Sequence, residues 1–77
     1  MQHIGSVIRK KRRRVFLSQA ELSKKTNIPQ TTISWWELGH GCPDFYQCVR
    51  IADALGTSLD EMREEYLKQE RIDRTNC

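Results

Sequence analysis

The basic residues of this sequence are concentrated near its beginning. Residues 1–25 contain eight Lys or Arg residues and one acidic residue, Glu21, which gives this part a net charge of +7. The rest of the chain carries −4, so the overall charge of +3 hides a strong asymmetry. Such a cluster indicates a polyanion as partner, although a solvated helix face would have the same composition. The basic residues are Arg9, Lys10, Lys11, Arg12, Arg13, Arg14, Lys24 and Lys25.

Cysteine and histidine residues are the other candidates for chemistry. His40, Cys42 and Cys48 are close in sequence, but a zinc site would need Cys77 or His3 as well, without a regular spacing. We therefore expect no metal site and no cofactor. The three cysteines are interpreted as reduced thiols, with Cys48 a small residue of the core. Neither histidine accompanies a credible nucleophile and no paired carboxylates lie on apolar segments, so we expect no enzyme.

Length and composition limit the chain to one small domain. It has 77 residues, of which 38% are apolar and 30% are charged. About a dozen large side chains are available for a core, which is too few to enclose a deep catalytic cleft. No apolar run approaches the roughly 20 residues of a membrane span, and the sequence turns basic after Ile8, unlike a signal peptide. We expect a cytoplasmic protein.

Residues 19–38 have the pattern of two short helices joined by a tight turn. Ser18 and Glu21 have the spacing of a capping box at the start of the first helix. Asn27 tolerates the left-handed conformation in which helices often end, and Pro29 suits the first turn of a new helix. Ser23 is small, as required where the helices cross, whereas Thr26 stands where a larger apolar side chain is expected.

The second of these helices, over about residues 29–37, has one apolar face. Ile33 and Trp36 are separated by three positions and therefore lie on the same side. Two helices in this arrangement form a helix-turn-helix, which offers its second helix to the major groove of DNA. The opposite, exposed side then carries Gln30, Thr31, Ser34 and Trp35.

A basic residue continues the apolar stripe of the first predicted helix, over residues 4–14. Ile4, Ile8 and Arg12 follow each other at intervals of four and share one face. An arginine that faces the core requires an acidic partner, and Glu37, at the end of the helix-turn-helix, is the candidate. We predict a partly buried Arg12–Glu37 ion pair; the alternative is that Arg12 is one more surface arginine.

The remaining elements complete an all-α domain. We predict a loop over residues 38–44, a helix over 45–55 that is capped by Asp44 and ended by Gly56, and a last helix after a Ser58–Glu61 capping box. Residues 1–63 form the domain in this interpretation, and residues 64–77 a charged helical extension or tail. The expected core residues of the last two helices are Phe45, Cys48, Ile51, Ala52, Leu55, Leu59 and Met62.

The whole pattern resembles the compact five-helix, lambda repressor-like DNA-binding domain of phage repressors and Cro proteins, the Xre or Cro/CI type. The resemblance covers residue 4 to about residue 63. Phe16 departs from it, because the family usually has glycine there, so the turn after the first helix is expected to differ; Asn27 replaces the usual turn glycine. With no further domain visible, we expect a short stand-alone regulator. The shared positions are Ile8, Arg12, Leu17, Ser18, Gln19, Ala20, Glu21, Leu22, Ile28, Pro29, Gln30, Ile33, Ser34, Trp36, Glu37, Gly39, Pro43, Ile51, Ala52, Ala54, Leu55, Gly56, Ser58 and Leu59.

The resemblance implies a sequence-specific regulator of transcription, most simply a repressor, that binds a palindromic operator in double-stranded DNA as a homodimer. Its dimer contact is expected at the last helix, with Tyr66 and Leu67. For Trp35 the alternative is half-buried packing beside the first helix or against a partner protein. The base contacts implied are Gln30, Thr31, Ser34 and Trp35, and the phosphate contacts Gln19, Thr32, His40, Arg14 and Lys24.

A second function is compatible with the same fold. Small domains of this type also serve as protein-interaction modules, such as antitoxins, anti-repressors or adaptors. In that case Trp35 would anchor a protein interface rather than contact DNA.

Overall fold

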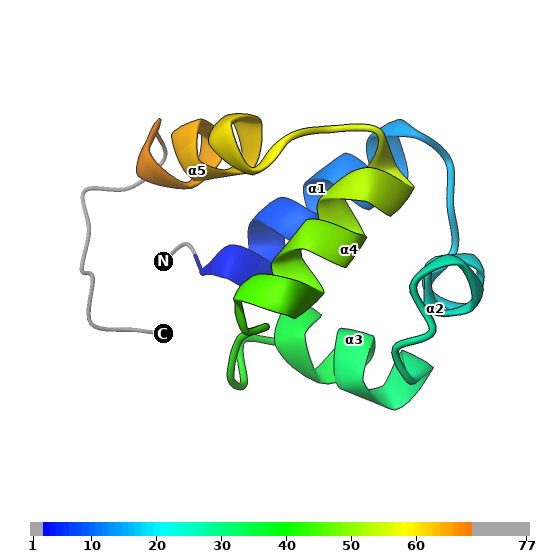
Figure 1. Cartoon of the computed structure of the whole chain (residues 1–77). Helices are drawn as coiled ribbons and strands as arrows, with labels where there is room; N and C mark the ends of the chain where they lie inside the picture. Colours follow the sequence, from blue (N-terminus) through cyan, green and yellow to red (C-terminus); the bar gives the residue numbers. More distant parts are fainter. Residues whose placement is uncertain (1–2, 69–77) are drawn as a thin grey trace.

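The computed structural model describes residues 3–68 and contains five helices and no strand in that range. In Figure 1, α4 lies across α1, with α3 below them, α2 to one side and α5 at the upper end. The all-α fold and the predicted bounds of the first and fourth helices are confirmed. The helices are α1 (Ile4–Arg14), α2 (Gln19–Thr26), α3 (Gln30–Glu37), α4 (Phe45–Leu55) and α5 (Leu59–Lys68).

Local hydrogen bonds set the helix ends. The Ser18 hydroxyl accepts from the Glu21 N–H at 3.0 Å, and the Glu21 carboxylate accepts from the Ser18 N–H at 2.8 Å, which confirms the capping box of α2. These bonds hold the pKa of the Glu21 carboxyl below its usual value. Asn27 ends α2 in the left-handed region with φ 64°. Pro29 precedes α3 as its N-cap instead of entering the first turn.

The core lies where α1, α3 and α4 meet. Ile8, Ile33 and Ile51 are fully buried at its centre, and one comes from each of these helices. α2 adds Leu22 and α5 adds Met62, which is also buried. Each helix therefore contributes a side chain to a single apolar cluster, which fixes α3 against the rest of the domain.

The core prediction is wrong for Phe45. This side chain is 75% exposed, although it stands on the same stripe as Ile51 and Leu55. Burial decreases toward the N-terminus of α4: Leu55 and Ile51 are buried, Cys48 is partly buried and Phe45 is exposed. The prediction therefore identifies the correct face of α4. The first turn of this helix, however, is not covered by the other helices.

The interpretation of the cysteines as reduced thiols is wrong for Cys42, which is disulfide-bonded. Cys48 is a free thiol, and its burial, together with nearby Asp44, raises the pKa of this group. Cys48 is partly buried, so it lines the edge of the core rather than its centre.

Thr26 is polar at a position where the pattern expects an apolar side chain, and its hydrogen bonds account for this difference. Its side chain is almost fully buried, with 1% exposure. The hydroxyl donates to the Leu22 carbonyl at 2.8 Å and accepts from the Ile28 N–H at 3.3 Å. The buried hydroxyl is thus satisfied on both sides and secures the backbone of the turn between α2 and α3.

Phe16 adopts the backbone conformation that a glycine would take. Its φ is 58°, in the left-handed region, and its side chain is 90% exposed. Phe16 therefore occupies the left-handed conformation itself, and the expected difference of this turn from that of the family stays a prediction. A non-glycine residue in this region carries a backbone strain of about 1–2 kcal/mol.

Replacing Phe16 with glycine is expected to raise the free energy of unfolding by about 1 kcal/mol. The substitution removes that strain. Glycine also increases the entropy of the unfolded chain, and this reduces the gain in stability by about 0.5–1 kcal/mol. Urea unfolding measures the effect. Val15→Gly is the matched control, because Val15 has φ −101° and is expected to lose stability on the same change. A lower midpoint for Phe16→Gly than for the unmodified protein would contradict the assigned strain.

Helices α1 and α3 approach each other closely at Gly5. This residue is buried, and a Cβ atom built on it would lie 1.7 Å from the Trp36 carbonyl oxygen. The same atom would lie 2.9 Å from the Glu37 backbone nitrogen. Only glycine fits here, since the neighbouring atoms are backbone and cannot rotate away.

Candidate nucleic-acid interface

Helix α3 presents an exposed side without charge. Ile33, Trp36 and Glu37 are buried, and Glu37 is the only charged residue of the helix. Gln30, Thr31 and Trp35 are exposed, while Thr32 and Ser34 are partly exposed. An amide, hydroxyls and an indole therefore cover the accessible surface of α3, and these groups can form hydrogen bonds and apolar contacts without carrying a charge.

A hydrogen bond and a buried side chain fix the turn before α3. The Ser23 hydroxyl donates to the Ile28 carbonyl at 2.6 Å, which ties α2 to the first residues before α3. Ile28 itself is buried, with 5% exposure. The start of α3, where Gln30 and Thr31 lie, is consequently fixed relative to α2.

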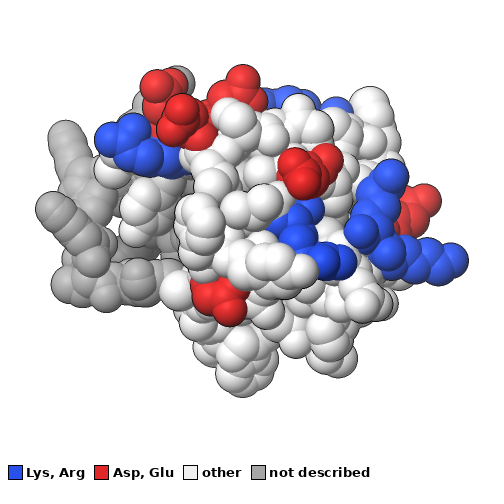
Figure 2. All heavy atoms as spheres, in the orientation of Figure 1, with Lys and Arg blue, Asp and Glu red and all other residues white. Residues whose placement is uncertain are grey.

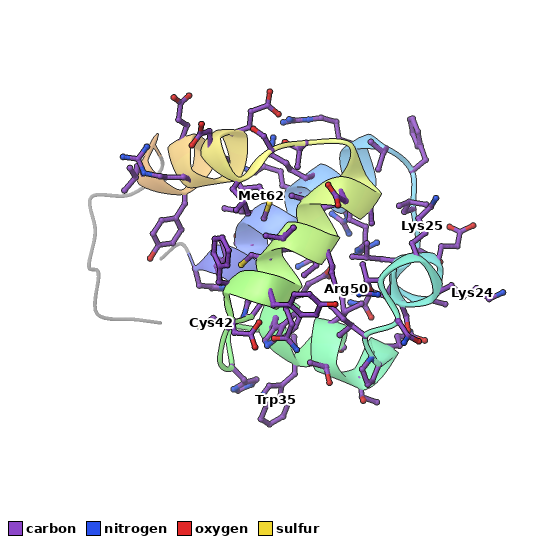
Figure 3. All side chains as sticks on the ribbon, viewed as in Figure 1. Lys24, Lys25, Trp35, Cys42, Arg50 and Met62 are labelled. Carbon is purple, nitrogen blue, oxygen red and sulfur yellow. The ribbon has the colours of Figure 1, made fainter. Side chains whose placement is uncertain are left out.

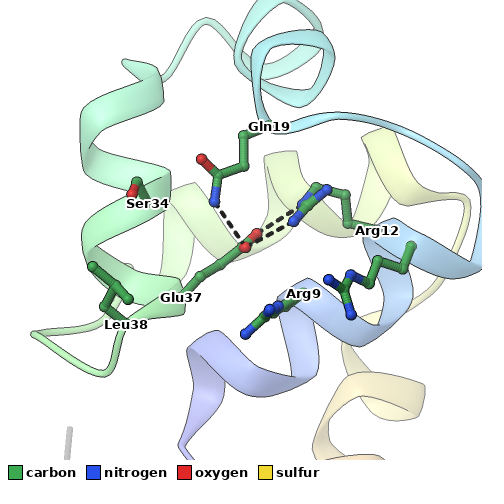
Figure 4. Close-up of a pocket in the computed structure, with 7 residues that line it drawn as sticks. Arg9, Arg12, Gln19, Ser34, Glu37 and Leu38 are labelled. Carbon is green, nitrogen blue, oxygen red and sulfur yellow. Dashed lines mark hydrogen bonds and ion pairs between the residues drawn. The ribbon is translucent and has the colours of Figure 1, made fainter.

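Arg12, Glu37 and Gln19 form one network behind α3 (Figure 4). Arg12 Nε and Nη2 donate to the two Glu37 carboxylate oxygens at 2.8 and 2.9 Å. Arg12 Nη1 donates to the Leu17 carbonyl at 2.8 Å, and the Gln19 amide nitrogen donates to Glu37 Oε1 at 2.9 Å. Side-chain exposure is 11% for Arg12 and 4% for Glu37. The hydrogen bond to Glu37 raises the pKa of Arg12, so the guanidinium stays charged.

This network bears on which side chains near α3 are available to DNA. The amide nitrogen of Gln19, expected at a DNA phosphate, donates to Glu37 in this structure. Arg12 is likewise engaged, which leaves its neighbours Arg9 and Arg13 as the exposed cations of that side of α1. Both line a pocket of about 160 Å³ between α1, α2 and α3, together with Ser34 and Leu38. Sequence reasoning did not separate these two arginines from the rest of the basic run.

Other charged residues flank α3 at a greater distance. Figure 2 shows Lys and Arg side chains over α2 and α4 with acidic side chains close to them, and mainly acidic side chains over α5. Lys24 is exposed on α2 and projects from the side of the domain (Figure 3). Arg14 is exposed at the end of α1. Neither of these two predicted phosphate contacts lines the pocket beside Ser34.

Arg50 has a structural role that sequence reasoning missed. Its Nε donates to the Thr26 carbonyl at 2.9 Å, and its Nη1 donates to the Tyr46 hydroxyl at 2.9 Å. It thereby satisfies a carbonyl at the C-terminal end of α2. The spacing of Tyr46 and Arg50, at i and i+4 on α4, was the signal available for half of this arrangement.

Trp35 contacts the loop that follows α3. Its indole and the His40 imidazole have ring centroids 4.4 Å apart, with planes inclined by 32°. Trp35 remains 57% exposed, and His40 is exposed as well. The structure therefore gives the indole a neighbour in this loop, which neither packing alternative had included.

Metal-binding clusters and membrane-spanning helices are both absent from residues 3–68. Within this range no group of three His, Cys, Asp or Glu residues could hold a metal ion. No helix in the same part of the chain has the length and apolar character needed to cross a membrane.

Comparison with known proteins agrees with this geometry. A family model described as helix-turn-helix matches residues 8–62, a range that begins in α1 and ends in α5. Searches of curated proteins and of solved structures found no significant match. The family comprises DNA-binding regulators, and its domain is not typically enzymatic. Since the match covers more than half of the sequence, the chain belongs to the helix-turn-helix family of the Xre/Cro/CI type.

Proposed function

We propose that this protein is a sequence-specific regulator that binds double-stranded DNA and represses transcription, with α3 in the major groove. The observation that carries the proposal is the neutral, polar exposed side of α3, with exposed Arg9 and Arg13 of α1 around a pocket that Ser34 also lines. A groove-reading helix needs hydrogen-bonding groups for base edges, and positive charge beside it for the phosphates. The domain has both features, the hydrogen-bonding groups on α3 and positive charge beside them.

The base contacts are assigned to the exposed residues of α3. Gln30 lies at the start of the helix, where its amide can bond bidentately to the N6 and N7 atoms of adenine. Thr31 can contact a thymine methyl, and Ser34 lies one turn beyond Gln30. Thr32 is partly exposed, as a phosphate contact at the edge of the groove requires.

Phosphate contacts are assigned to residues on both sides of α3. Arg9 and Arg13 lie near Ser34 and Gln19 around the pocket, and Lys24 and Arg14 are exposed farther away. Gln19 would offer its amide to a phosphate only by leaving Glu37 or by using the N-terminal backbone amides of α2. Contacts of this kind position the protein but do not read sequence.

The protein is proposed to act as a homodimer on a palindromic operator, with half-sites about 34 Å apart. Of the two predicted dimer residues on α5, Tyr66 packs against the core and Leu67 is 52% exposed. Leu67 is therefore the better candidate for the contact. Helix α5 runs across residue 63, so the proposed domain boundary there lies within a helix.

Selection of bound sequences from a random DNA pool tests the proposal. An enriched palindromic sequence, bound by the purified protein in a gel shift, is the expected result. A domain that serves only as an interaction module would enrich no sequence and would bind DNA equally whatever its sequence. The exposed Trp35 favours this second function, because tryptophan is common at the centre of protein interfaces.

Gln30→Ala is expected to change which sites are bound, whereas Lys24→Ala is expected to weaken all sites alike. The first removes a base contact, worth about 1–3 kcal/mol in discrimination. The second removes one phosphate contact and should lower the salt slope by about one unit. Both are measured by titrating operator and random DNA over a range of salt concentrations. Equal weakening of both DNAs by Gln30→Ala would exclude it as a base contact.

A further inference from the structure

The loop after α3 holds the Trp35 indole in place. His40 covers one side of the indole, with ring centroids 4.4 Å apart. The His40 N–H also donates to the Trp35 carbonyl at 3.0 Å, so backbone and ring are both tied to the same residue. A Cβ built on Gly41 would lie 4.0 Å from Trp35 Cδ1 and Nε1, which places the loop backbone beside the five-membered ring. The indole thus has two neighbouring residues in the loop, yet remains 57% exposed.

The position of Trp35 on α3 determines what its free surface meets. Thr31 and Trp35 stand at i and i+4, so they share one line along the exposed face of the helix. Leu38 continues this line at i+7 and is 68% exposed. Figure 3 shows the Trp35 side chain projecting away from the domain beyond α3. The line is opposite the buried face of Ile33, Trp36 and Glu37 and is the part of the helix that would reach deepest into a groove.

We propose that Trp35 recognises the C5 methyl group of a thymine, and that His40 is the positioning residue that fixes the indole for this contact. The inference rests on the proposed binding of DNA in the major groove. Base edges form the floor of that groove, and the apolar group they present is the thymine methyl. With His40 stacked on one side, the Trp35 indole offers the DNA an uncharged, apolar surface. Such a surface suits contact with a methyl group.

Positioning by His40 has a physical benefit. Ordering a free side chain on binding costs conformational entropy, and a side chain held in its bound orientation avoids this cost. His40 was also predicted as a phosphate contact, a role that depends on its ring nitrogens. The stacking role depends only on its planar shape, so a phenylalanine at this position separates the two.

The first experiment removes one methyl group from the DNA. In an operator obtained by selection, each thymine is replaced in turn by deoxyuridine, which lacks only the C5 methyl. At the thymine that Trp35 contacts, we expect about fourfold weaker binding, the effect of burying one methyl group. The same replacement should have no effect on Trp35→Ala. Thr31→Ala is the matched control from the same line of α3, and it should keep the sensitivity at that position.

The second experiment tests His40 in the same assay. His40→Ala should reduce the sensitivity to deoxyuridine to less than twofold, and the double variant with Trp35→Ala should bind no more weakly than Trp35→Ala alone. His40→Phe should restore the sensitivity, because it stacks without donating a hydrogen bond. The free protein offers an independent readout: ring current from Trp35 should shift the His40 ring protons in the NMR spectrum, and Trp35→Ala should abolish that shift.

Three results would overturn the inference in distinguishable ways. A selected operator whose binding is unchanged by deoxyuridine at every position would exclude methyl recognition and leave the proposed function standing. Equal binding by His40→Phe and His40→Ala, both insensitive to deoxyuridine, would exclude positioning by stacking. Failure of the unmodified protein to select any DNA sequence would overturn the proposed function, and this inference with it.

Discussion

Replacing Glu37 with glutamine is expected to lower the free energy of unfolding by about 3–5 kcal/mol, the usual cost of removing one partner from a buried ion pair. The Glu37 carboxylate accepts from Arg12 twice and from Gln19 once, and its side chain is 4% exposed. The NH₂ group of a glutamine at this position would face the N–H donors of Arg12 or Gln19. The Arg12 guanidinium would also lose its counter-charge. Folded domains have about 5–15 kcal/mol in total and one of this size lies near the lower end, so the variant should keep little stability and be partly unfolded.

Urea unfolding of Glu37→Gln is compared with Arg13→Gln, which removes an exposed arginine from the same helix that carries Arg12. Exposed charges contribute about 0–1 kcal/mol, so the control should move the midpoint little. Replacing Arg12 and Glu37 together by apolar residues of similar volume should recover much of the loss, because no charge is then left buried. Equal midpoint shifts for Glu37→Gln and the control would mean that Arg12 is available to phosphates.

Gly5→Ala is expected to lower the free energy of unfolding by about 3 kcal/mol or more, at or above the upper end of the usual range for an overpacked site. An added methyl group would lie 1.7 Å from the Trp36 carbonyl oxygen and 2.4 Å from its carbonyl carbon. Because these atoms are backbone, α1 and α3 must move apart. Such a movement would also displace Arg12 from Glu37, since they lie on these two helices.

Gly56→Ala is the matched control for Gly5→Ala. Gly56 has φ +69° and no neighbouring atom within 4 Å of an added Cβ, so the control has left-handed strain and no collision. That strain is expected to cost about 1–2 kcal/mol. Urea midpoints that coincide for the two variants would show that α1 and α3 separate at little cost. Gly5→Ala would itself favour α1 by about 1 kcal/mol, so any net loss understates the collision.

The sequence by itself determined the elements whose causes are local. Ser18 and Glu21 are three positions apart, and their reciprocal bonds depend on that spacing alone. Asn27 and Gly56 end their helices for the same kind of reason, a single residue that tolerates the left-handed region. The pairing of Arg12 with Glu37 could also be predicted, because helical periodicity directs both toward the core where an unpaired charge is costly.

The tertiary structure alone decided which side chains meet across helices. Gln19 reaches Glu37, and Arg50 reaches the Thr26 carbonyl, only at the crossing angles that these helices adopt. Phe45 lies outside the core because α4 begins beyond the helices that cover it. Periodicity gives the direction of a side chain around its helix, but not where along the helix the neighbouring elements end. The stacking of His40 on Trp35 likewise depends on the path of a loop, for which the sequence has no repeating pattern.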